Sequence, residues 1–212
     1  AIVRREQPDA VLSVDTFRPD VARMAVEEYG VAMINDVSGG NPEGAFGGTE
    51  LREDAYRTPG ESDVPPIFAM AARLGVPYIL MSSRPSLMSI LQECSAKVQL
   101  LHSLGVKDII LDPGFGFGKT LEENYAIMHG LEQLDALGLP VLVGVSRKSM
   151  VTRLLGCTAG EALAGTTALH AIALMKGAAI LRVHDVKEAA DCVKLAEALT
   201  ANSKNLKPKP TA

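Results

Sequence analysis

Short apolar runs alternate along the chain with longer stretches in which apolar residues recur at helical spacing. The apolar runs predict strands, since each spans only a few residues and ends at a polar residue or a turn. The predicted strands cover residues 11–16, 31–34, 78–81, 107–112, 141–145 and 179–184. The helical stretches cover residues 21–29, 66–74, 86–104, 121–137, 151–155, 160–176 and 186–200, with a short helical end at 1–7. The order of elements is therefore strand then helix, repeated along the chain.

Continuous apolar strands separated by helices are typical of a parallel sheet covered by helices. An open doubly wound sheet and a (β/α)₈ TIM barrel both fit this order. The barrel is favoured because each predicted strand carries a polar residue at its carboxyl end, and these ends converge on one mouth in a barrel. The residues at these ends are Asp15, Asn35, Ser82, Asp112, Ser146 and His184.

A barrel needs eight strands, and the helical end at residues 1–7 precedes the first predicted strand. We therefore expect this chain to hold the last six units of a (β/α)₈ barrel, without the first two. One α/β domain is expected over residues 1–201, followed by a disordered tail at 202–212. Residues 41–66, rich in Gly and Pro, are expected to form a long surface loop.

Residues 112–120, Asp-Pro-Gly-Phe-Gly-Phe-Gly-Lys-Thr, form a glycine-rich loop after the fourth predicted strand. A Walker A loop is excluded, because the position five residues before Gly118 is Pro113. The dinucleotide fingerprint is excluded as well, since Gly114, Gly116 and Gly118 alternate strictly. Glycine allows the backbone to approach a ligand closely, and Thr120 suits the start of the next helix.

Composition limits the kind of protein that this chain can be. It has 212 residues, is 47% hydrophobic and carries a net charge of −4, which favours one globular domain and disfavours a nucleic-acid binder with a broad basic face. Its three cysteines, Cys94, Cys157 and Cys192, have neither zinc spacing nor a C-x-x-C pair, and favour reduced thiols in a cytosolic protein. No apolar run approaches the ~20 residues of a membrane span.

The strand ends offer two kinds of ligand surface. Asp15, Asn35 and Asp112 provide acceptors that suit a flat heterocycle with an edge of N–H donors. The later strands provide cations for a phosphate or pyrophosphate, and Ser149 begins a helix whose backbone amides can receive an anion. These cations are Arg147, Lys148, Arg182 and, when protonated, His184.

Structural roles are also compatible with these residues. Asp15 or Asp36 alone could cap the following helix. Arg182 and Lys148 could pair with nearby carboxylates, and His184 with Asp185. A functional site is favoured because the polar residues recur at the same end of every strand.

The motifs together resemble dihydropteroate synthases, the folate-pathway transferases inhibited by sulfonamides. The matching segments, which cover nearly the whole chain in order, are residues 13–16, 34–40, 112–120, 146–149 and 182–186. The resemblance implies a pterin-binding (β/α)₈ barrel that condenses a dihydropterin pyrophosphate with p-aminobenzoate, releases pyrophosphate and uses Mg²⁺. It also implies a cytoplasmic homodimer with small-molecule substrates.

The resemblance implies a role for each site residue as well. Asp15, Asn35, Asp112 and Lys148 would bind the pterin, and Arg182 and His184 the pyrophosphate. Phe117, Arg147 and Ser149 would line the p-aminobenzoate site. Lys148, Arg182 and His184 are thereby implied in catalysis.

Three features depart from the family pattern. The segment of the type Asn-Val-Thr-Pro-Asp-Ser-Phe, whose Asn binds the metal, is absent, so no metal ligand is expected within this chain. Residues 41–66 are longer than the usual connection, and Met81-Ser82 stands where the family usually has Met-His. Two alternatives stay open: the pterin-binding barrel of a corrinoid-dependent methyltransferase, and a non-catalytic barrel that binds pterin or phosphate.

Overall fold

The computed structural model describes residues 2–41 and 64–203, which form one parallel six-stranded sheet in the order β1-β2-β3-β4-β5-β6. Every neighbouring pair of strands is parallel. The strands are β1 (Ser13–Asp15), β2 (Met33–Asp36), β3 (Tyr78–Met81), β4 (Ile109–Asp112), β5 (Val141–Val143) and β6 (Ala178–Leu181). This sequential order is that of a barrel, whereas a doubly wound sheet would reverse its strand order at a switch point.

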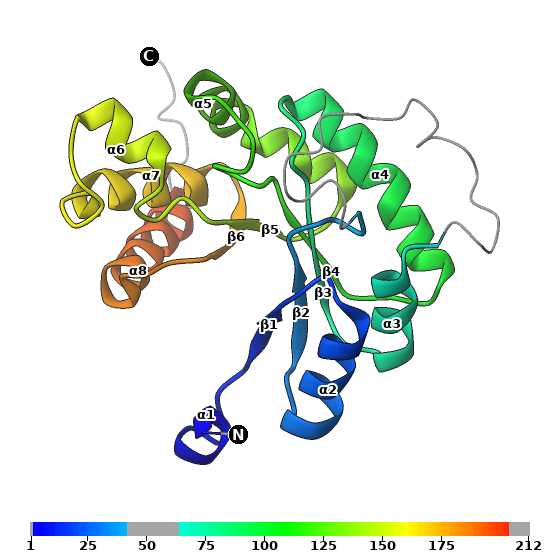
Figure 1. The fold of residues 1–212 in the computed structure, drawn as a ribbon. Coiled ribbons are helices and arrows are strands. Elements are labelled where there is room, and N and C mark those ends of the chain that lie inside the picture. The colour runs from blue at the N-terminus through cyan, green and yellow to red at the C-terminus, as the bar shows by residue number, and fades with distance from the viewer. Residues whose placement is uncertain (1, 42–63, 204–212) are drawn as a thin grey trace.

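Helices connect successive strands and pack on one face of the sheet. Figure 1 shows the strands at the centre and the helices around the outside of the curled sheet, with α2, α3 and α4 on the right of the view and α6, α7 and α8 on the left. The helices are α1 (Ile2–Glu6), α2 (Pro19–Tyr29), α3 (Pro66–Leu74), α4 (Leu87–Ser103), α5 (Leu121–His129), α6 (Ser149–Leu155), α7 (Leu163–Met175) and α8 (Val186–Ser203), with a 3₁₀ helix at Leu131–Leu137. The architecture is a curled partial barrel, as expected.

Local signals set several helix ends as the sequence predicts. Pro19 begins α2, and Gly30 ends it in the left-handed conformation. Thr120 caps α5 through a capping box with Glu123, and Ser86 caps α4 in the same manner. The N-cap position of α2 is Arg18, so Asp15 does not cap this helix.

Two predicted helical stretches differ in the structure. The stretch 121–137 is not one helix, because α5 ends at His129 and a 3₁₀ helix follows Gly130. The break falls at Gly130, where the chain packs closely against α4. A Cβ added to Gly130 would stand only 2.5 Å from Leu87 Cδ1. Helix α7 begins at Leu163 rather than near residue 160.

Strands β5 and β6 end earlier than predicted, at Val143 and Leu181. A strand extends only while its neighbour offers pairing groups, and Val143 O accepts the last bond between them, from Arg182 N at 2.9 Å. Beyond that bond the two chains form the loops of the mouth. Of the long loop predicted at 41–66, residues 42–63 lie outside the described residues, as do residues 204–212 of the predicted tail; Ser203 still belongs to α8.

The main core lies between the sheet and its helices. It includes Ile34, Tyr78, Leu80 and Leu111 from the strands, with Phe68 from α3. A smaller cluster on the opposite face joins Ile79, Ile110 and Leu142, against which Met33 and Ile180 pack. Because side chains alternate along a strand, these two clusters identify which residues face the helices and which face the barrel interior.

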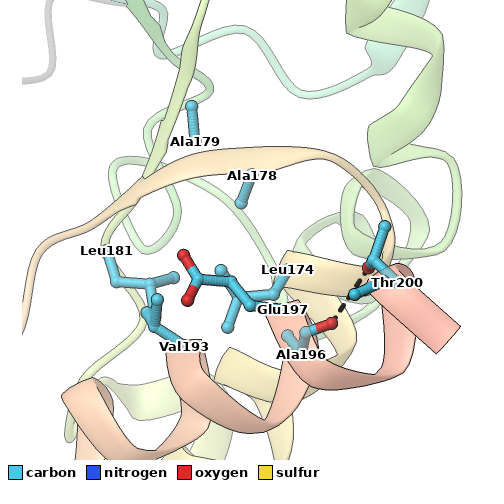
Figure 2. Close-up of a pocket in the computed structure, with 9 residues that line it drawn as sticks. Leu174, Ala178, Ala179, Leu181, Val193, Ala196, Glu197 and Thr200 are labelled. Carbon is cyan, nitrogen blue, oxygen red and sulfur yellow. Dashed lines mark hydrogen bonds between the residues drawn. The ribbon is translucent and has the colours of Figure 1, made fainter.

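The sheet ends at β1 and β6, which do not pair with each other. Next to β6, on the face covered by helices, lies a pocket of about 470 Å³ between this strand and α8 (Figure 2). It is lined mainly by small and apolar side chains, among them Leu174, Leu181, Val193 and Ala196. The pocket lies on the helix side of an edge strand, and its lining residues include none of the polar residues of the mouth. No helix among residues 2–41 and 64–203 is long and apolar enough to cross a membrane.

Asp36 organises the loop after β2 from inside the core. It is fully buried and accepts hydrogen bonds from Ser38 N at 2.8 Å, from Gly40 N at 2.7 Å and from the Tyr78 hydroxyl. Burial, then the charge of Asp36, raises the pKa of Tyr78 well above its ordinary value, so this phenol stays a donor.

We predict that Tyr78→Phe lowers the free energy of unfolding by about 1–3 kcal/mol, because it removes a donor from a buried carboxylate. Tyr125→Phe is the control, since Tyr125 donates only to the Met150 carbonyl at 3.1 Å, a neutral bond worth about 0.5–1.5 kcal/mol. Urea unfolding followed by circular dichroism measures both. An equal loss in the two variants would contradict the role given to Asp36.

Candidate active site

The mouth is formed by the residues that lie two positions beyond the inner apolar cluster on the same strands. Side chains two positions apart point to the same face, so a polar layer follows the apolar layer inside the curled sheet. Its polar members are Asn35, Asp112 and Arg182, with Met81 and Gly144 at the equivalent positions of the other two segments. Asp15 joins them, because its Cα pairs in register with that of Asn35. The predicted convergence therefore holds for Asp15, Asn35 and Asp112, whereas Ser82 donates to Glu93 of α4 instead of facing the mouth.

Asp15 and Arg182 meet across the opening between the two outer strands. Arg182 Nη2 donates to Asp15 Oδ2 at 3.1 Å, and Asn35 Nδ2 donates to the same oxygen at 3.2 Å. The side chains of Asp15 and Arg182 are 47% and 53% exposed. Exposed ion pairs contribute little to stability, so this contact can exchange readily for a ligand with complementary charge.

Asp112 is the buried acid of the mouth. It is 8% exposed, and its Oδ1 accepts Gly114 N at 2.7 Å. No donor in the described part of the chain reaches Oδ2, which leaves this oxygen available to a ligand. Burial raises the pKa of Asp112, while Gly114 N–H and the positive charges of Lys148, Arg182 and Lys119 act to lower it.

Lys148 stands beside Asp112, against the glycine-rich loop. Its ammonium donates to the Phe115 carbonyl and lies 4.6 Å from the centre of the Phe117 ring. Burial lowers the pKa of Lys148, partly offset by the Asp112 charge. An acid and a base that lie close together, and whose pKa values both move toward the neutral forms, are typical of a ligand or catalytic site.

The glycine-rich loop is held by two polar side chains to which the sequence analysis assigned no role. Lys119 Nζ donates to Gly114 O at 2.9 Å and to Ser82 O at 3.1 Å, which ties the loop to the end of β3. Asn124, 2% exposed, accepts Gly116 N at 2.7 Å and donates to Thr120 O at 2.6 Å. Lys119 lies within the glycine-rich motif and Asn124 just after it, and this position in the sequence could have indicated that they hold the loop.

Burial lowers the pKa of Lys119 from its ordinary 10.5 to about 8, against the raising effect of Asp112. The folded protein therefore loses this proton at a lower pH than the unfolded chain. Because the unfolded chain then binds more protons, the contribution of Lys119 to stability rises with pH between these two values and is constant below them.

Two further contacts join the loops after β5 and β6. Ser146 Oγ lies 3.0 Å from His184 Nδ1, and the Arg147 guanidinium makes two hydrogen bonds to Asp185, one of them 3.1 Å from Nε to Oδ2. The bond from Arg147 holds the pKa of Asp185 below its usual range. Asp185 thus pairs with Arg147, and the suggested pairing of His184 with Asp185 is wrong.

Arg147 adopts a φ of 56°, a left-handed conformation that is uncommon for a residue with a side chain. Ser149 follows as the first residue of α6 and is exposed to solvent. No side chain caps this helix at Lys148, so its first backbone N–H groups face the loop without a protein cap.

The end of β3 differs in character from the rest of the mouth. Ser82 donates to Glu93 from α4, and Glu93 also pairs with Arg84 at 3.3 Å and with Lys97 at 2.9 Å. Burial acts to raise the pKa of Glu93, but Lys97, Ser82 and Arg84 outweigh it and the pKa falls. Ser82 is therefore part of a charge network with Glu93, Arg84 and Lys97.

The described residues do not make a metal site by themselves. Among residues 2–41 and 64–203, no group of three or more His, Cys, Asp or Glu side chains could hold a metal ion. Mg²⁺ stays a prediction from the resemblance.

Fold and site define the class: a β/α barrel whose carboxyl-end mouth combines a buried acid with several cations. The model of the pterin binding enzyme family matches residues 1–184. The dihydropteroate synthase of Bacillus subtilis (strain 168) is 35% identical over 196 residues, which is 89% of this chain and 61% of that protein. The corresponding enzyme of Synechocystis sp. is 38% identical over 211 residues, covering 92% of this chain and 65% of that protein.

Solved structures agree with the sequence relatives. The Yersinia pestis dihydropteroate synthase with a pterine-sulfa conjugate has a TM-score of 0.78 at 32% identity, covering 94% of this chain and 72% of that one. The Thermus thermophilus enzyme in complex with 4-aminobenzoate has a TM-score of 0.75 at 33% identity, covering 92% and 72%. This chain belongs to the family of pterin binding enzymes. It spans only 61% to 65% of the length of the two curated relatives.

We predict that Gly114→Ala destabilises the protein more than Gly118→Ala. Both glycines have positive φ, +67° and +64°, so each alanine carries a strain of about 1–2 kcal/mol. Only at Gly114 would the new Cβ meet backbone, 2.2 Å from Ser82 O, whereas at Gly118 nothing lies within 4 Å. Urea unfolding should therefore separate the two variants, and equal free energies of unfolding would contradict the close approach of the loop to β3.

Proposed function

We propose that the whole protein is a dihydropteroate synthase, which joins 6-hydroxymethyl-7,8-dihydropterin pyrophosphate to p-aminobenzoate and releases pyrophosphate. The observation that carries this proposal is the placement of Asp112 and Arg182 in one polar layer of the mouth, with an available acceptor oxygen on one and an exposed cation on the other. The family match and the ligands named for the related structures support it.

The acidic side of the mouth fits the pterin. A pterin presents an edge of neighbouring N–H donors, and a carboxylate accepts such a pair well. Asp112 offers Oδ2, with Asn35 and Asp15 joined by a hydrogen bond on the neighbouring strands. Lys148 and Phe117 stand beside this acceptor and would bound the ring.

The basic side fits the diphosphate. Arg182 and His184 follow β6, and Lys148 adds a second cation beside Arg182, near Asp112. Contact between unit charges is worth about 4 kcal/mol at an effective dielectric near 20, before desolvation. These groups would stabilise the pyrophosphate as the C–O bond to the exocyclic methylene breaks.

The start of α6 fits the carboxylate of p-aminobenzoate. The uncapped amides around Ser149 face an anion favourably, and Arg147 and Phe117 lie on the adjoining loops. The amine nitrogen would then form the new C–N bond to the methylene carbon and release its proton. This dissociative order, with pyrophosphate leaving first, is part of the proposal.

Assembly and location belong to the proposal as well. The unpaired edges of β1 and β6 are where two further strands would complete the barrel. Large apolar side chains are exposed on α6, α7 and α8, among them Leu155, Met175, Leu195 and Leu199, which supports a homodimer through these helices. A cytoplasmic location and a requirement for Mg²⁺ stay predictions.

The direct test uses the full-length gene product with dihydropterin pyrophosphate and p-aminobenzoate, measured as dihydropteroate formed and pyrophosphate released. Binding of the pterin without product would favour a non-catalytic barrel. A response to methyltetrahydrofolate instead would favour a corrinoid-dependent methyltransferase, although the cationic side of the mouth counts against that alternative.

We predict that Asp112→Asn raises the dissociation constant of the pterin by roughly 30- to 100-fold, because a paired acceptor is lost at a cost of about 2–3 kcal/mol. Asp108→Asn is the matched control, since Asp108 is exposed just before the other end of β4. Titration calorimetry measures both dissociation constants. Unchanged affinity in Asp112→Asn would contradict the proposed pterin site at Asp112.

The division of the mouth gives a second expectation for the same assay. Arg182→Ala should weaken the pterin pyrophosphate more than the pterin alone, while Arg153→Ala, in the exposed last turn of α6, should change neither. Equal losses for both ligands would contradict separate acidic and basic sides.

A further inference from the structure

Ser146 makes two contacts to one residue of the neighbouring loop. Its hydroxyl oxygen lies 3.3 Å from the backbone N of His184 and 3.0 Å from the Nδ1 atom of the same residue. Ser146 is 4% exposed, whereas His184 is exposed to solvent. A buried hydroxyl and an exposed imidazole thus share a short contact at the mouth.

The hydroxyl has one proton, and its contacts limit where this proton can go. The backbone N–H of His184 can only donate, so the serine oxygen accepts from it. No other acceptor for the Ser146 hydroxyl is found among residues 2–41 and 64–203. A buried hydroxyl that did not donate would leave its O–H without a partner, and Nδ1 is the acceptor within reach.

We propose that Ser146 holds the neutral ring of His184 in the tautomer that carries its proton on Nε2. The hydrogen bond made by one ring nitrogen decides which tautomer is present at the other. Nδ1 accepts from Ser146, so Nε2 carries the hydrogen, and no partner in the described part of the chain reaches Nε2. Ser146 is therefore a positioning residue for His184.

The consequence for the mouth rests on the proposed function. A phosphate oxygen needs a donor, and an Nε2–H group supplies one, whereas the opposite tautomer would present a lone pair to the anion and repel it. With Nε2–H, a neutral histidine contributes to diphosphate binding beside Arg182 without requiring protonation of the ring.

The surrounding contacts keep this arrangement fixed. Arg147 pairs with Asp185, the residue next to His184, so the same two loops are joined a second time. Arg182 N donates to Val143 O at 2.9 Å just before the loops separate. Ser146 and His184 therefore meet between two further connections, which limits their relative motion.

The test is nitrogen-15 NMR of the histidine rings in the ligand-free chain at a pH of about 8.5, two units above the pKa of an ordinary imidazole. Of the four histidines, the His184 signals are identified by their loss in His184→Gln. We expect an unprotonated Nδ1 and a protonated Nε2 in the wild-type protein and in Ser146→Thr, and a mixture of tautomers in Ser146→Ala. Ser83→Ala is the matched control, because Ser83 is an exposed serine after β3 and should leave the spectrum unchanged.

Inorganic pyrophosphate is the binding probe for the same variants. Its dissociation constant should rise in Ser146→Ala, by less than the roughly tenfold that complete loss of one hydrogen bond would cause, because some of the rings keep the proton on Nε2. The affinity should recover in Ser146→Thr. A proton on Nδ1 in the wild-type ring, or the same tautomer in Ser146→Ala, would overturn the inference; the wild-type spectrum decides this even where a variant does not fold. The expected tautomer without pyrophosphate binding would contradict the proposed function of the site and limit the Ser146–His184 bond to a structural role.

Discussion

The alternation of side chains between the two faces of parallel strands determines where the polar groups of this protein lie. The apolar layer of Ile79, Ile110 and Leu142 fixes which face is the interior of the curled sheet. Two positions further on, the same alternation turns Asn35, Asp112 and Arg182 to that interior. A one-residue shift of register would turn Asp112 from the interior toward the helix-covered core. The apolar packing and the chemistry of the mouth therefore depend on the same strand register.

Burial then gives the mouth its electrostatic character. Asp112 and Lys148 are close enough to stabilise each other's charge, yet burial is the largest influence on the pKa of both and moves each toward its neutral form. Burying such groups costs free energy that a charged or hydrogen-bonding partner can offset. A ligand that brings N–H donors to the acid and phosphate oxygens to the cations would satisfy both sides at once, as the proposed pterin diphosphate would.

Features carried by local chemistry were predictable from the sequence. Pro19 and Gly30 set the ends of α2, Thr120 caps α5, and the strands follow one another in the order expected for a barrel. The choice of side-chain partner was not predictable, because it depends on distances between loops far apart in the chain. The pairing of Asp15 with Arg182, 167 residues apart, is such a case, and so are the breaks at Gly130 and at the ends of β5 and β6.

One interior mouth is proposed to receive both halves of a pterin diphosphate. The decisive measurement is a crystal structure of the full-length protein with 6-hydroxymethylpterin and inorganic pyrophosphate. We expect the pterin edge within hydrogen-bond distance of Asp112 Oδ2 and the diphosphate against Arg182 and His184. Either molecule bound outside this mouth, for example in the pocket between β6 and α8, with Asp112 and Arg182 left without ligand, would refute the proposed site.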